Sequence, residues 1–249
     1  MQTRGFTLLE LSIVLVIIGL LIGGVFAGQS LIHTAQLNAM VSEFNRYQMA
    51  TQNFKQQYQA LPGDMNNATA IWGSAGGTGS DTVCQAIAST TALTCNGNGD
   101  GVIGTSVSVN DERYRFWQHL ANAKMIEGAY TGANAGVAPG VDVPASRFGA
   151  NAGWYLQIAS SYNGGSAYAF NTDYGTGHML RLDNGSSTVT PKDAWIIDKK
   201  YDDGKPGMGN VLVYNWPSCT NAANQSDLTA TYTLTVTTIS CNLWFLASF

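Results

Sequence analysis

A single acid inside an apolar segment is the first feature that points to chemistry. Glu10 lies four residues after Phe6, and it is the one formal charge between Arg4 and Glu43. Apart from Glu10, the segment from Phe6 to Ala27 holds only apolar residues, glycine, serine and threonine. A carboxylate in a membrane-spanning segment costs at least about 2.5 kcal/mol and as a rule marks a functional site. We therefore expect Glu10 to have a functional role.

Two acidic, glycine-rich stretches offer oxygen ligands for a hard cation. In the first, Asn96, Asn98 and Asp100 alternate ahead of Gly101, which is the spacing of an EF-hand-like calcium loop. The twelfth position of that pattern is Val107, where the pattern requires a bidentate Glu. Turn-forming Asn-Gly repeats produce the same string without any metal. Both interpretations stay open for this loop.

The second stretch follows a predicted strand and contains Asp198, Asp202 and Asp203. Carboxylates this close in sequence form a candidate calcium site. Lysines lie among and beside them, so mutual neutralisation on a solvated hairpin explains the same composition. Asp-Gly and Pro-Gly are also strong turn signals. Apart from calcium at one of these two stretches, the sequence indicates no cofactor.

Residues suited to catalysis do not fall into a known motif. The histidines, His33, His119 and His178, lie in three different sequence settings. The chain has no G-x-S-x-G, H-E-x-x-H or Walker sequence. We therefore predict that the protein is not an enzyme.

The apolar segment is long enough to cross a membrane. Its roughly 22 residues span about 33 Å as a helix, which matches the thickness of a bilayer core. A signal peptide is a simpler alternative, but its apolar stretch is only about 7–15 residues and ends in a small-residue cleavage site. No A-x-A site closes this run. A plain anchor explains the length but does not explain Glu10.

The opening sequence MQTRG-FTLLEL resembles the class III leader and mature start of type IV pilins and type II secretion pseudopilins. The resemblance implies cleavage after Gly5 by a prepilin peptidase on the cytoplasmic side, followed by N-methylation of the new amino group of Phe6. It also implies that Glu10 pairs with the amino terminus of a neighbouring subunit during assembly. Amine and carboxylate are each costly in apolar surroundings, and pairing offsets much of that cost.

The resemblance implies a structural subunit of a type IV pilus-like filament. A type II secretion pseudopilin and a filament-borne adhesin or binding module are the alternatives. The implied partners are homologous subunits, the prepilin peptidase and methyltransferase, the inner-membrane assembly machinery and, before assembly, membrane lipid. The implied location is the bacterial inner membrane, with a single pass, the N-terminus inside and the head periplasmic, and then an envelope or surface filament. Arg4 alone supplies the cytoplasmic positive charge.

Sequence patterns divide the chain into four parts. We expect a leader at 1–5, a transmembrane helix at 6–27, an amphipathic stalk helix at 28–60 and a head at 61–249. Apolar residues with the period of one helix face predict the stalk's buried side; they are Leu37, Met40, Val41, Phe44, Tyr47, Phe54 and Tyr58. Pro62 ends the helix, because proline disfavours helix in the preceding residue.

The cysteines, Cys84, Cys95, Cys219 and Cys241, allow three disulfide pairings. The pairs that are close in sequence are the simplest, and no C-x-x-C spacing suggests zinc or redox chemistry. An oxidising periplasm favours disulfides. A Cys219–Cys241 pair resembles the C-terminal disulfide loop of many type IV pilins.

The head reads as an α+β domain in which an antiparallel sheet packs on the stalk helix, the pilin fold. A helix is predicted at 111–125, with Asp111 as N-cap, and Trp72 is a predicted core residue. Residues 132–153 are a predicted Gly/Ala loop. Strand candidates are 154–159, 167–170, 179–182, 194–197, 211–216 and 242–246, and 228–238 alternates like a strand.

Composition fits an exported protein. Only 11% of residues are charged, and the net charge is -4. Loss of Arg4 with the leader would make the net charge about -5. Broad nucleic-acid binding requires a basic surface, so we expect no nucleic-acid partner.

Overall fold

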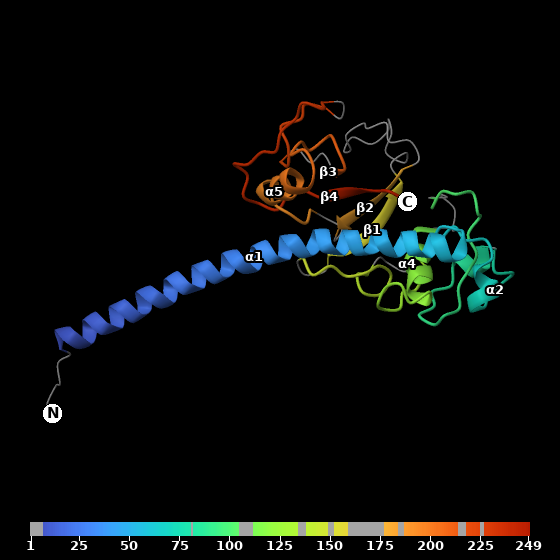
Figure 1. Ribbon diagram of the computed structural model, residues 1–249, viewed down its shortest axis with the longest axis horizontal. Coiled ribbons are helices and arrows are strands. Elements are labelled where there is room, and N and C mark those ends of the chain that lie inside the picture. Colours follow the sequence, from blue (N-terminus) through green and yellow to red (C-terminus); the bar gives the residue numbers. More distant parts are fainter. Residues whose placement is uncertain are drawn as a thin grey trace.

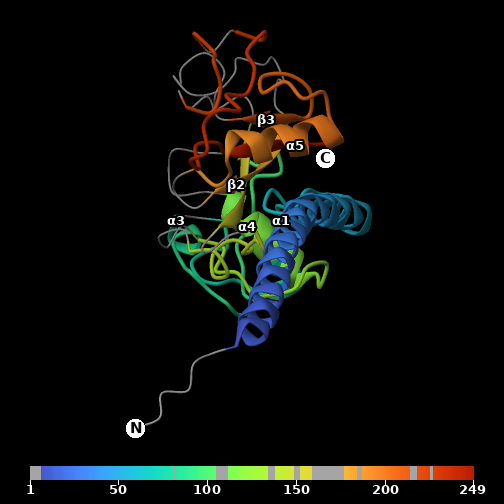
Figure 2. The same ribbon diagram turned by 90° about the vertical axis from the view of Figure 1, so that its left-hand side faces the viewer.

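The computed structural model describes residues 7–80, 82–104, 112–133, 138–148, 152–158, 177–183, 187–213, 218–224 and 227–249. One long helix, α1 (Leu8–Tyr58), runs the length of the molecule, and the described elements that follow it form a head that packs against its second half (Figure 1). A view along this helix shows the head on one side of it (Figure 2). The fold is α+β and pilin-like, as the sequence predicted.

Helix α1 contains 51 residues, which corresponds to about 76 Å. Thr7 is its N-cap, and the helix ends where Gln59 adopts a left-handed conformation with φ 53°. The single helix predicted for 6–60 is therefore confirmed over 8–58. Pro62 follows directly in the turn, in agreement with the predicted stop.

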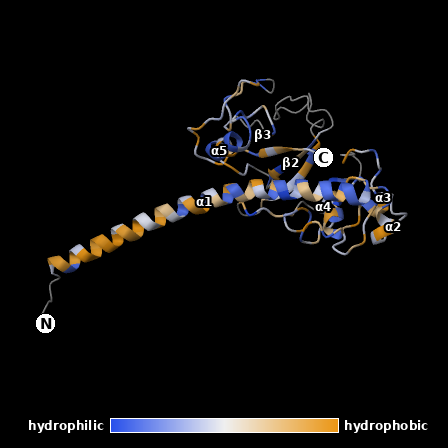
Figure 3. Ribbon diagram, in the orientation of Figure 1, coloured by the Kyte–Doolittle hydropathy of each residue, from blue (hydrophilic) through white to orange (hydrophobic). Residues whose placement is uncertain are grey.

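The first half of α1 projects away from the head and consists mainly of hydrophobic residues (Figure 3). Its large apolar residues are exposed from Leu8 through Ile32. Among the described residues, α1 is the helix whose length and composition suffice to span a membrane. A surface of this kind is unstable in water and requires either lipid or other protein around it.

The sheet of the head has four antiparallel strands in the order β1-β2-β4-β3. The strands are β1 (Gly153–Ile158), β2 (His178–Asp183), β3 (Val211–Val213) and β4 (Leu243–Ala247). The other helices are α2 (Ala68–Trp72), α3 (Thr82–Gln85), α4 (Glu112–Asn122) and α5 (Pro191–Tyr201). In Figure 1, α4 lies below the stalk near its C-terminal end, the sheet lies above it, and α5 lies nearer the projecting half of α1.

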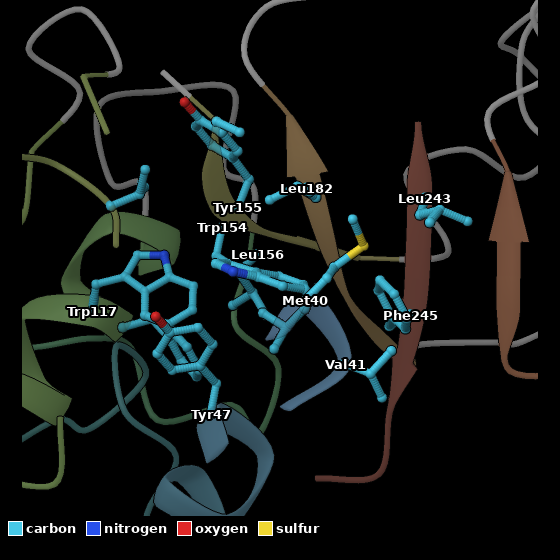
Figure 4. Close-up of a cluster of buried hydrophobic side chains, with 14 of the residues drawn as sticks. Met40, Val41, Tyr47, Trp117, Trp154, Tyr155, Leu156, Leu182, Leu243 and Phe245 are labelled. Carbon is cyan, nitrogen blue, oxygen red and sulfur yellow. The ribbon is translucent and has the colours of Figure 1, made fainter. Parts of the chain in front are cut away.

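The predicted apolar stripe of the stalk is the face that packs on the sheet. Phe44 stacks on Phe245 of β4 with ring centroids 4.9 Å apart. Tyr47 lies edge-on to Trp117 of α4 at 5.0 Å and to Trp154 of β1 at 5.9 Å. Figure 4 shows Tyr47 of α1, Trp117 of α4 and Trp154 and Phe245 of the sheet converging in the core. Every predicted stripe residue is buried or packs against the core, so the prediction is confirmed.

Most predicted elements of the head are confirmed, with shifted ends. The strands at 154–159, 179–182 and 242–246 correspond to β1, β2 and β4, and the helix at 111–125 corresponds to α4. Residues 211–213 of the predicted 211–216 form β3. The candidate strand at 167–170 and the N-cap Asp111 lie outside the described residues. Trp72 is partly buried and packs against the core.

The predicted strand at 194–197 is wrong, because these residues belong to helix α5. Thr190 accepts a hydrogen bond from the backbone N–H of Asp193, and Pro191 occupies the first turn. A polar N-cap followed by proline is a strong helix start. These flanking signals outweigh the β-preference of the short apolar run Trp195 to Ile197.

The alternating segment 228–238 does not form a strand; it consists of turns with one isolated bridge, between Tyr232 and Thr220. Leu228 and Leu234 are exposed, so the alternation does not correspond to one buried face. This segment lies inside a disulfide loop that connects Cys219 with Cys241. The second disulfide joins Cys84 with Cys95. The short-range pairings are therefore the ones present.

Candidate assembly helix and head sites

Glu10 closes a capping box at the start of α1. Its carboxylate accepts hydrogen bonds from the backbone N–H of Thr7 at 2.8 Å and from the Thr7 hydroxyl at 2.9 Å. The Thr7 hydroxyl in turn accepts from the backbone N–H of Glu10 at 3.2 Å. A negative charge at a helix N-terminus is favourable, because the unpaired N–H groups and the helix dipole meet it there.

The capping box gives Glu10 a partner within its own chain. The side chain is nonetheless exposed on the projecting helix, where an approaching group can reach it. Gly5 and Phe6, the predicted cleavage and methylation positions, lie outside the described residues. Thr7 directly follows Phe6 in sequence, so an amine created on Phe6 would be one residue away from the helix cap.

Glu43 fixes the stalk to the head, a role that the sequence analysis did not assign. Its carboxylate accepts hydrogen bonds from the Trp154 indole at 2.7 Å, the Ser146 hydroxyl at 2.7 Å and the Arg147 backbone N–H at 3.0 Å. The side chain is buried. Its position on the apolar face, beside Met40 and Tyr47, was the available signal: a charge on a core stripe is rare unless it is paired.

His33 makes a polar contact with the head near the start of the stalk. Its Nε2 lies 2.8 Å from Oδ1 of Asp193 in the first turn of α5. Oδ2 of Asp193 accepts from the Thr190 hydroxyl at 2.8 Å. Both oxygens of Asp193 are thus satisfied. The contact orients α5 against α1 and is structural in character.

The loop that resembles a calcium-binding sequence is built around a carboxylate. Asp64, which ends the Leu-Pro-Gly-Asp turn after α1, accepts from the backbone N–H groups of Gly99 at 2.7 Å and Asp100 at 3.0 Å through Oδ1. Its Oδ2 accepts from the N–H of Gly101 at 3.0 Å. Backbone N–H groups that point at one centre stabilise an anion.

Glu112 supports the same loop from α4. It accepts from the backbone N–H of Asn98 at 2.9 Å and of Gly104 at 2.7 Å. Burial raises the pKa of Glu112 to about 7 against these hydrogen bonds, and the charges of Asp64 and Asp100 add to the rise. Two acids thus hold five backbone N–H groups of the loop.

The structure brings Asn98 and Asp100 together but turns Asn96 elsewhere. The Asn98 amide donates to Asp100 at 2.8 Å. The Asn96 side chain accepts from the Thr69 N–H at 2.8 Å and donates to Ser80 at 3.1 Å. The carboxylates of Asp64 and Glu112 therefore give a metal-free account of the loop. Calcium at Asn96, Asn98 and Asp100 stays a prediction.

Asp198, Asp202 and Asp203 converge at the end of α5, with one ligand oxygen of each within 4.8 Å of the others. Asp198 is buried and accepts from the Tyr232 hydroxyl at 2.6 Å and the Gly204 N–H at 2.9 Å. Burial raises the pKa of Asp198 to about 7, and the neighbouring charges of Asp203 and Asp202 contribute. The three carboxylates are hard oxygen donors of the kind that calcium takes. Asp202 also accepts from the Val211 N–H at 2.8 Å, and Asp203 accepts from the Lys205 N–H at 2.8 Å. Calcium at Asp198, Asp202 and Asp203 stays a prediction.

His119 and His178 serve the fold. The fully buried His119 accepts from the Gly63 N–H at 2.9 Å through Nδ1, and its Nε2 lies 3.0 Å from the Thr94 hydroxyl. Burial lowers the pKa of His119 to about 3, with the charge of Arg115 as a further cause. His178 accepts from the Ile103 N–H at 2.9 Å. Each ring holds a loop in place as a neutral acceptor.

Residues 1–26 match the family profile described as the prokaryotic N-terminal methylation motif. No curated protein and no solved structure gives a significant match to the chain. The matched motif marks the prepilins of the type IV pilin and pseudopilin family, and the chain carries it on an exposed apolar helix joined to a pilin-like α+β head. Proteins of this family are structural rather than enzymatic. The motif also implies processing by a prepilin peptidase and assembly with other pilins.

Proposed function

We propose that the protein is a subunit of a type IV pilus-like filament that assembles through the first half of α1. The observation that carries this proposal is the exposed apolar surface from Leu8 to Ile32, which begins within the methylation motif. Such a helix can rest in a membrane as a single subunit and can pack with copies of itself in a filament core. A leader at 1–5 would keep the chain in the membrane until cleavage.

Glu10 would set the register of assembly. In the single chain, its partners are the N–H and hydroxyl of Thr7. Cleavage after Gly5 would create a cationic amine on Phe6, and the amine of a neighbouring subunit is a stronger partner than a neutral hydroxyl. The pairing would then be satisfied only where one subunit is correctly placed against the next.

Two substitutions test this proposal. Glu10→Val should leave cleavage intact and block or misregister filament assembly, as seen by N-terminal sequencing and electron microscopy. Thr7→Val is the matched control, since it removes the hydroxyl that bonds to Glu10 but keeps the carboxylate. Normal filaments from Glu10→Val would refute the role of Glu10. Gly5→Glu should leave the leader attached, and an N-terminal Phe in that product would refute the cleavage site.

A type II secretion pseudopilin is the second candidate. The converging carboxylates of Asp198, Asp202 and Asp203 favour it. The resemblance implies this link, because calcium stabilises the head domain in some pseudopilins. The Cys219–Cys241 loop supports the pilus assignment instead. Deletion of the gene followed by assays of surface fibres and of protein secretion separates the two candidates.

A further inference from the structure

A groove of about 420 Å³ lies between the stalk and α5, just beyond the exposed apolar half of α1. Leu37 of the stalk and Ile196 and Ile197 of α5 contribute apolar walls. Lys192 and Lys200 also line it, at either end of α5. Its lining from α1 begins at Ser30.

The position of this groove along α1 corresponds to the surface of a membrane. The last large apolar side chains exposed on this part of α1 are Leu31, with 72% exposure, and Ile32, with 61%. The groove spans Ser30 to Asn38 along α1, or about 12 Å. The headgroup region of one leaflet is about 5–8 Å deep and lies at the end of the hydrocarbon core. With residues 6–27 filling the hydrocarbon core, the headgroup region begins near Gly28 and covers about five residues of α1. The groove, whose lining begins at Ser30, therefore opens into the lipid headgroups.

Charge makes the rim of the groove suited to an anion. Lys192 and Lys200 are exposed, and the Lys200 amine is held at 2.8 Å from the side-chain oxygen of Asn38. Asp193 is the acid in the lining, and its carboxylate is engaged by His33 and by Thr190. The lining therefore carries two lysines against one acid whose oxygens already have hydrogen-bond partners, and it keeps an excess of positive charge.

We infer that the groove between α1 and α5 binds an anionic phospholipid of the leaflet on the head side of the membrane, with its headgroup along the rim between Lys192 and Lys200. The inference rests on the proposed membrane-anchored state of the subunit. Continuity with the lipid-facing surface of α1 and charge complementarity together select this occupant. The bound lipid would hold the head against the membrane before the subunit enters a filament.

The test uses the full-length chain in nanodiscs that contain phosphatidylglycerol with a photoreactive acyl chain near the glycerol. After illumination, mass spectrometry should map the crosslinked lipid to peptides covering 30–38 and 192–201. Lys192→Gln and Lys200→Gln should each raise the phosphatidylglycerol fraction needed for half-maximal crosslinking about fivefold. Lys199→Gln is the matched control, since Lys199 lies 4.6 Å over the Trp195 ring and outside the groove lining. This control should match the wild type.

Every other outcome counts against the inference. Equal crosslinking by phosphatidylcholine would remove the anionic selectivity, and competition by inorganic phosphate would indicate a free-anion site. Equal effects of all three lysine variants would indicate general surface charge. Crosslinks from the groove to a second subunit would assign it to protein contacts. A chain that does not enter the nanodisc defeats the membrane-anchored proposal itself, whereas an inserted chain without groove crosslinks defeats only the lipid site.

Discussion

The carboxylate of Glu43 and the indole of Trp154, 111 residues apart in the sequence, meet at 2.7 Å beneath the sheet. Trp154 is fully buried and Glu43 is buried with it. This contact joins the stalk helix to the first residues of β1. It therefore fixes the position of the sheet along the helix, whereas apolar packing alone would allow the sheet to shift.

Replacement of this acid tests its contribution to stability. We expect Glu43→Gln to lower the free energy of unfolding by about 1–3 kcal/mol, because one amide oxygen cannot replace a carboxylate that accepts three hydrogen bonds. Urea unfolding of the full chain in detergent, followed by tryptophan fluorescence, measures the change. Glu127→Gln is the control, since Glu127 is exposed and its loss should stay within about 0.5 kcal/mol. Equal free energies of unfolding for the two variants would show that Glu43 does not stabilise the contact between the stalk and the head.

Two glycines with the same backbone conformation allow the cost of backbone strain to be distinguished from the cost of a steric clash. Gly63 and Gly101 have φ values of 87° and 85°. A Cβ on Gly63 would lie 2.5 Å from the carbonyl oxygen of Glu112, whereas one on Gly101 would meet nothing within 4 Å. We expect Gly101→Ala to cost about 1–2 kcal/mol and Gly63→Ala clearly more. Thermal unfolding of both variants measures the difference, and similar melting temperatures would contradict the crowded turn.

The buried His119 predicts a dependence of stability on pH. Its folded pKa of about 3 lies below the ordinary value of 6.5, so the unfolded chain binds the proton more readily between these values. The stability that depends on neutral His119 is therefore complete above pH 6.5 and is lost as the pH falls toward 3. His119→Asn retains an acceptor for the Gly63 N–H and cannot titrate. We expect a shallower decline in its urea midpoint between pH 6.5 and 4 than in the wild type, and parallel declines would contradict a buried neutral His119.

Calcium should stabilise the head through Asp198, Asp202 and Asp203. At a concentration about 100-fold above its Kd, calcium contributes about 2.7 kcal/mol, which raises the melting temperature by about 5–10 °C. Differential scanning fluorimetry of the full chain with calcium and with EGTA measures this shift. Asp203→Asn should reduce it, and Asp227→Asn, a half-buried acid in the Cys219–Cys241 loop, should retain it. Identical melting temperatures with and without calcium would exclude this site.

A hydrophobic pattern predicts an element reliably when it repeats over many residues. The stripe from Leu37 to Tyr58 has the helix period over many turns, and the structure buries it as predicted. The error at 194–197 arose from a short run, for which strand and helix patterns coincide and the capping residues Thr190 and Pro191 decide. Short apolar runs carry too few repeats to overcome such ambiguity.

The polar contacts of the head were beyond sequence reasoning for a different reason. Asp64 reaches a loop 35 residues later in the chain, and Glu43 reaches Ser146 and Trp154 over more than 100 residues. Such pairs depend on the final path of the backbone, which residue types and spacing do not encode locally. The sequence singles out Glu10 because its spacing from Phe6 is local, and its role in assembly stays a prediction.

The unbroken run of α1 has a mechanical consequence. Tension applied to the anchored end of a subunit passes along one helix that contains no proline, and it reaches the head near His33. Gly19, Gly23, Gly24 and Gly28 precede that point, and each weakens a helix by about 1 kcal/mol. These turns bear the same tension as the head but are weaker, so they should unwind at a lower force than the sheet, and the displayed domain would keep its shape while they extend.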